Sequence, residues 1–90
     1  MSSSKTPIWR NDIDALAFQP GQHAGFCMVH RRAFRTLLRK TPSPPDCVAF
    51  FTTHREAFQA AARAKLRGVN IAETANFHLT SRDVARQLKI

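Results

Sequence analysis

Residues 24–40 read AGFCMVHRRAFRTLLRK, and within them the hydrophobic pattern changes from the period of a strand to that of a helix. Through residues 24–29, apolar side chains fall on both faces of an extended chain, which predicts a central strand covered on both sides. Through residues 31–40, apolar side chains instead share one helical face, opposite a face of arginines. This strand followed directly by an amphipathic helix is the unit from which the rest of the fold is predicted.

A second strand is predicted just before this unit. Residues 13–18 are short and apolar-leaning, and residues 19–22, Gln-Pro-Gly-Gln, have the composition of a turn. Proline presets the first central dihedral of a type II turn, and Gly21 supplies the positive φ that the next position needs. We therefore expect residues 13–18 and 24–29 to form an antiparallel hairpin.

The middle of the chain is predicted to be helical. Residues 41–45, Thr-Pro-Ser-Pro-Pro, end the first helix, because proline disfavours helix in the residue before it. One stripe of apolar and small side chains then predicts a single helix over residues 46–67, with Gly68 as its C-terminal cap. A competing interpretation starts this helix at Thr53, where Thr-His-Arg-Glu has the form of a capping box, and makes residues 47–52 a strand. The unbroken stripe favours the single helix.

The C-terminal part adds a strand at residues 75–79 and a short helix that begins at Thr80-Ser-Arg-Asp83. The order of elements indicates an α+β fold with a small antiparallel sheet of about three strands, two main helices and a short C-terminal helix. Ninety residues support one small domain. We place this domain at residues 8–90 and expect the serine-rich residues 1–7 to be disordered.

Three stretches resemble a small bacterial domain-of-unknown-function family. They are FCMVHRRAF at residues 26–34, FFTTHR at residues 50–55 continuing to Ala61-Ala62, and FHLTSRD at residues 77–83. The resemblance implies a compact α+β fold, and it implies no known activity.

The net charge is the feature that bears most on function. The chain carries 14 Lys+Arg against 6 Asp+Glu, a formal net charge of +8. Residues 30–67 hold nine basic and two acidic side chains, so +7 of this excess lies there. Six acids cannot pair fourteen bases internally, so the excess must face solvent or a partner. Arginine suits bidentate contacts to phosphate and carboxylate, so the candidate partners are nucleic acid and an acidic protein.

The candidate anion-binding residues are six arginines on the two main predicted helices. Four occur on the first helix and two on the second: Arg31, Arg32, Arg35, Arg39, Arg63 and Arg67. One alternative is a solvated polar face without a binding role. Another is a protein–protein interaction or homodimer domain, in which a second chain covers the long apolar stripe. All seven Phe occupy core-phased positions and Tyr is absent, so the sequence shows no platform for stacking bases.

The reactive side chains lack a catalytic or metal-binding arrangement. Cys27 and Cys47 form no Cys-x-x-Cys motif, and we expect both to be reduced and buried. His54 lies on the apolar stripe and is expected in the core. Cys27-x-x-His30 alone has ligand-like spacing, and the carboxylates are too scattered for paired acid–base chemistry. We therefore expect a non-catalytic domain with no cofactor and no metal.

The longest apolar run, residues 47–51, is too short to cross a bilayer, and the first residues have no apolar stretch typical of a secretory signal. We therefore expect a cytoplasmic protein that makes no membrane contact.

Overall fold

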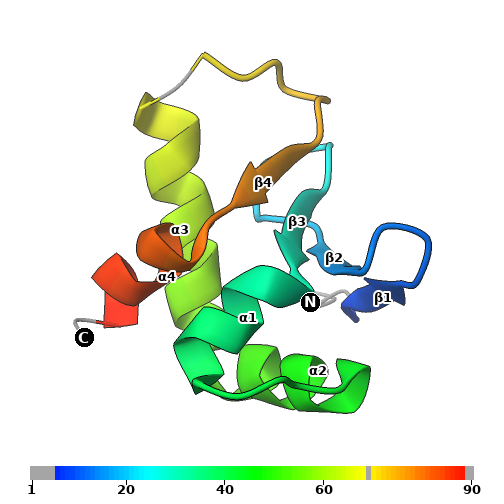
Figure 1. Ribbon diagram of the computed structural model, residues 1–90. Coiled ribbons are helices and arrows are strands. Elements are labelled where there is room, and N and C mark those ends of the chain that lie inside the picture. Colours follow the sequence, from blue (N-terminus) through cyan, green and yellow to red (C-terminus); the bar gives the residue numbers. More distant parts are fainter. Residues whose placement is uncertain (1–5, 69, 89–90) are drawn as a thin grey trace.

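The computed structural model of this chain describes residues 6–68 and 70–88. The fold is α+β, as the sequence predicts. The prediction of disorder for residues 1–7 lies mostly outside the described residues. In chain order the elements are β1 (Ile8–Arg10), β2 (Ala15–Phe18), β3 (Cys27–His30), α1 (Arg31–Leu38), α2 (Pro44–Thr53), α3 (Arg55–Gly68), β4 (Phe77–Leu79) and α4 (Ser81–Leu88) (Figure 1).

The sheet has four strands in the order β1-β2-β3-β4, one more than predicted. β1 pairs antiparallel with β2, and β2 pairs antiparallel with β3. β4 pairs parallel with β3, so the sheet is mixed and the prediction of an antiparallel sheet is wrong for this strand. The connection between β3 and β4 runs through three helices, and such a long crossover is what returns a chain in the parallel direction.

One face of the sheet and all four helices enclose the core. Alternate strand residues point to this face, and they meet Phe34 of α1, Phe51 of α2, Phe58 of α3 and Val84 of α4, all 0% exposed. These inward strand residues are Leu16, Phe18, Cys27, Val29, Phe77 and Leu79. The two-residue period of the strands and the helical stripes predicted from the sequence therefore meet in one apolar cluster.

α2 and α3 are separate helices, so the prediction of one unbroken helix over residues 46–67 is wrong. The chain leaves helical geometry at His54, with φ −113° and ψ 33°. Residues 47–52 are helical, as the apolar stripe indicated. The break leaves both halves of the stripe facing the same core, where the Phe51 and Phe58 rings have centroids 5.0 Å apart. Since the stripe keeps its phase through the break, the pattern could not reveal it.

α2 begins two residues earlier than predicted, at Pro44, because Ser43 caps it. The Ser43 hydroxyl accepts a hydrogen bond from the Asp46 backbone N–H at 3.2 Å, and the Asp46 carboxylate accepts one from the Ser43 N–H at 3.0 Å. This reciprocal pair is a capping box. At the other end of the pair of helices, Gly68 is the last residue of α3, and no described glycine has a positive φ.

The connection between β2 and β3 is a longer loop than the predicted turn. Its positive φ is at Gln22, at 63°, and not at Gly21, so the type II turn prediction is wrong. The Gly21 N–H donates to Gln59 Oε1 of α3 at 3.1 Å, which holds the loop against that helix. Tertiary contact with α3 therefore shapes this loop.

Candidate functional site

The parallel pairing of β3 and β4 places the starts of two helices at one edge of the sheet. α1 follows β3 directly, and α4 follows β4 after one residue. Figure 1 shows both arrows pointing the same way, with the chain entering α1 and α4 beyond them. In open sheets, ligands bind beyond the carboxyl ends of parallel strands.

A hollow of about 520 Å³ lies at this edge, and we call it the histidine hollow. One side comes from the end of β3 and from α1, and the other from β4 and the start of α4. Its lining residues are His30, Arg32, Ala33, Thr36, His78, Leu79, Thr80 and Ser81.

A second hollow runs along α1 and shares Arg32 and Thr36 with the first. We call it the α1 groove, and its volume is also about 520 Å³. Its lining residues are Arg32, Arg35, Thr36, Arg39, Lys40 and Thr41. Because two residues are common to both, the histidine hollow and the α1 groove lie next to each other.

The charges of the α1 groove are largely uncompensated. Across residues 6–68 and 70–88, the side chains of Arg32, Arg35 and Arg39 form no hydrogen bond or ion pair. Lys40 approaches Asp46 at 3.9 Å, with both side chains well exposed. Such an exposed pair contributes little energy, so this side of the helix presents a cationic surface.

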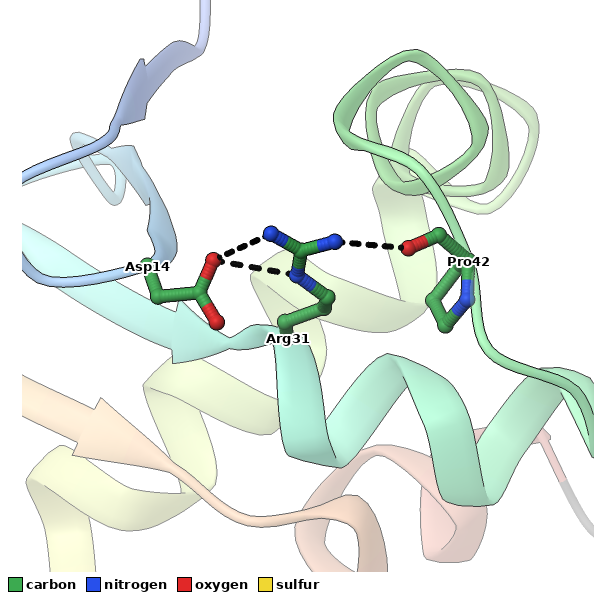
Figure 2. Close-up of polar contacts among 3 residues, drawn as sticks. All are labelled: Asp14, Arg31 and Pro42. Atoms are coloured by element: carbon green, nitrogen blue, oxygen red, sulfur yellow. Dashed lines mark hydrogen bonds and ion pairs between the residues drawn. The ribbon is translucent and has the colours of Figure 1, made fainter.

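Arg31 has a different role from its neighbours. Its Nε and Nη2 donate to one oxygen of Asp14 at 3.0 and 2.7 Å, and its Nη1 donates to the Pro42 carbonyl at 3.2 Å (Figure 2). Its guanidinium also lies over the Trp9 ring, 5.8 Å from the centroid. Arg31 therefore joins the sheet, α1 and the segment before α2, and its donors are engaged within the chain.

Arg63 and Arg67 lie on α3, which packs against α4, and both are exposed. Neither lines the α1 groove or the histidine hollow. Of the six predicted arginines, the structure thus gathers Arg32, Arg35 and Arg39 in one groove.

The pairing of His30 with His78 was not predicted from the sequence. The rings of His30 and His78 are stacked, with centroids 4.9 Å apart and an angle of 11° between planes. His78 pairs in register with Met28, two residues before His30, so the two rings are diagonal neighbours on one face. The pattern that could have found them is a strand leading straight into a helix, which occurs twice, at His30 and just after His78.

Burial lowers the pKa of His78, and repulsion from His30 and Lys65 lowers it further. An imidazole whose pKa lies below its usual value of about 6.5 is neutral at pH 7. The ring of His78 therefore lies in the hollow as a neutral aromatic surface.

The two cysteines are not part of this site. Both are free and 0% exposed. Burial raises the pKa of Cys27, and it raises the pKa of Cys47 to about 11. His54 is half-buried, with its ring centroid 4.5 Å from that of Phe50. Within the described part of the chain, no group of three or more His, Cys, Asp or Glu side chains could hold a metal ion.

We expect both thiols to be inert in the folded protein. Since the thiolate is the reacting species, a raised pKa and full burial should suppress reaction with an aromatic disulfide reagent near pH 8. The absorbance of the released thiolate should stay flat in buffer, and two thiols per chain should react after guanidinium is added. A rapid reaction of either thiol in buffer would contradict this.

No helix among the described residues is long and apolar enough to cross a membrane. No family model, curated protein or solved structure matches this chain, so the family resemblance stays a prediction.

Proposed function

We propose that this protein is a non-catalytic domain that binds nucleic acid through the α1 groove. The observation that carries the proposal is the set of three arginines, Arg32, Arg35 and Arg39, that share one groove without an acidic partner among the described residues. Guanidinium groups bind phosphate in bidentate fashion, and each neutralised phosphate releases counterions. A helix face of this kind can therefore follow a phosphate backbone.

The positions of these arginines on an anchored helix also support the proposal. Arg32 and Arg35 are three positions apart, so their side chains follow one side of α1. Arg39 is the left-handed C-cap residue at the end of that helix, with φ 60°, and it lines the same groove. The engaged guanidinium of Arg31 fixes the start of the same helix through Asp14 and Pro42. The cationic groups therefore project from a helix that is anchored before any ligand binds, which lowers the entropy lost on binding.

The alternative of a homo-oligomerisation domain depended on an apolar stripe too long for the sheet to cover. The break at His54 places α2 and α3 on the same core, and Phe51, Phe58 and Ala62 are 0% exposed. Among the described residues, the exposed large hydrophobic side chains are Ile8 and Phe26. The stripe therefore no longer supports that alternative, and the cationic groove supports nucleic acid.

The matched pair of double variants Arg35→Gln/Arg39→Gln and Arg63→Gln/Arg67→Gln tests this proposal. Each removes two positive charges spaced four residues apart, at the end of α1 in the first variant and within α3 in the second, so net charge changes equally. Binding of a fluorescent single strand should be measured by anisotropy across a salt series. We expect the α1 variant to weaken binding more than about tenfold at low salt and to reduce the log–log salt slope by about 1.4. We expect the α3 variant to change the slope by much less.

Two results would contradict the proposal. One is the absence of binding by the unaltered protein to single-stranded or duplex DNA or RNA at about 50 mM salt, where phosphate contacts are strong. The other is an equal loss in both double variants, which would show attraction by net charge and no role for the groove. Thermal unfolding of each variant should be measured as well, to check that weaker binding does not come from loss of the fold.

A further inference from the structure

We propose that the histidine hollow holds one base of a single-stranded nucleic acid whose phosphates lie along the α1 groove. This inference rests on the proposed function and adds the form of nucleic acid that is recognised. The volume of about 520 Å³ is within the range of about 300–1,000 Å³ that small-molecule sites occupy. It is far more space than a phosphate group needs.

The lining of the hollow has the chemistry of a base-binding surface. The stacked rings of His30 and His78 supply flat aromatic faces, and Ala33 and Leu79 supply apolar contacts. Single-strand binding proteins hold bases in this way, by stacking on aromatic side chains beside a cationic path for the backbone. Ser81 also lines the hollow, and a serine hydroxyl can hydrogen-bond to the polar edge of a base.

The polar groups on the α4 side of the hollow are already paired with one another. The His78 ring faces His30, and Lys65 is close enough to lower the pKa of His78. Lys65 is itself paired with Asp83 at 2.9 Å. Asp83 also accepts a hydrogen bond from the Thr80 N–H at 2.9 Å, which occupies a donor at the start of α4 with a carboxylate. The Thr80 N–H is therefore engaged within the chain, and Arg32, which lines both hollows, is the residue that can hold a phosphate beside a base.

The two residues shared by the hollows indicate where the sugar–phosphate backbone of the bound strand lies. Arg32 and Thr36 line both, so a phosphate held by Arg32 is adjacent to the histidine pair on one side and to Arg35 on the other. A strand with its phosphates in the α1 groove can therefore turn one base into the hollow. Bases of a duplex are stacked on one another and cannot enter, so we expect single strands to bind more tightly than duplex.

Two synthetic strands of equal length and charge test this inference, one with bases and one in which all sugars are abasic. We expect the unaltered protein to bind the base-bearing strand at least about fivefold more tightly at the same salt, the lower end of what stacking contributes. His78→Ala should bring this ratio close to one and leave the salt slope unchanged. His30→Ala should do the same, and it removes no helix cap, because the His30 side chain makes no capping hydrogen bond.

Arg35→Gln/Arg39→Gln is the control, because it should weaken both strands and keep their ratio. Equal binding of the two strands by the unaltered protein would overturn the inference and leave the proposed function standing. Retention of the ratio in both histidine variants would also overturn it. Failure of either strand to bind at low salt would overturn the proposed function and the inference together.

Discussion

Phe58→Ala should lower the free energy of unfolding by about 3–5 kcal/mol, the cost of emptying a large aromatic site in a packed core. Phe58 is 0% exposed and lies at the centre of the aromatic cluster. Its ring centroid is 5.0 Å from that of Phe51, 5.8 Å from Phe34, 6.1 Å from Phe50 and 6.4 Å from Phe18. These rings come from β2, α1, α2 and α3, so one substitution loosens the contact between the sheet and three helices.

Urea unfolding followed by circular dichroism measures this cost, and Phe26→Ala is the matched control. Phe26 is 37% exposed, so the same truncation there should cost clearly less, about 1–2 kcal/mol. Domains of this kind have stabilities of about 5–15 kcal/mol, so Phe58→Ala should leave a visibly unfolded fraction at low urea. Similar costs for the two variants would contradict the arrangement of the core.

Gly25→Ala should lower the free energy of unfolding by about 3 kcal/mol or more, because a Cβ there would overlap the backbone of Ala75. The two segments are held together at this point by several hydrogen bonds. The Ala24 N–H donates to the Glu73 carbonyl at 3.1 Å, and His23 Nε2 bonds to the Ala75 carbonyl at 2.8 Å. Separation of the segments to admit a methyl group would stretch these bonds.

Gly21→Ala is the control for this substitution. A Cβ at Gly21 meets no atom within 4 Å, and its φ is not positive, so alanine fits. We expect a change of about 0.5 kcal/mol or less, with a stabilising sign, because alanine restricts the unfolded chain. If both variants unfold at the same urea concentration, the close approach of residues 25 and 75 is contradicted. Loss of β4 pairing in Gly25→Ala should also weaken the base preference tested above.

The predictable parts of the fold are those that local periodicity determines. The change of period at His30 locates β3 and α1 because consecutive side chains alone decide it. The direction of β4 is not local, since it depends on how three helices return the chain to β3. The break at His54 could not be predicted either, because one non-helical residue leaves the apolar stripe in phase on both sides.

The candidate site was predictable to the same degree. The excess of basic over acidic residues predicted that some arginines face solvent or a partner. In the structure, three of them line one groove. The count could not show that Arg31 is engaged by Asp14, since that pairing needs the sheet and α1 in place. The His30–His78 pair depends on the parallel pairing of β3 and β4, so the prediction of an antiparallel sheet concealed it.

The parallel pairing also sets the order in which this surface can be assembled during synthesis. The arginines of α1 emerge early and are ready once that helix forms, whereas His78, Thr80 and Ser81 follow two helices later. Pairing between distant segments is slow, because closing a long loop costs entropy before any contact compensates. A nascent chain that lacks β4 therefore has the cationic face without the histidine hollow. Under the proposed function, such a chain attracts nucleic acid by charge alone, and discrimination between strands with and without bases arises only when β4 docks.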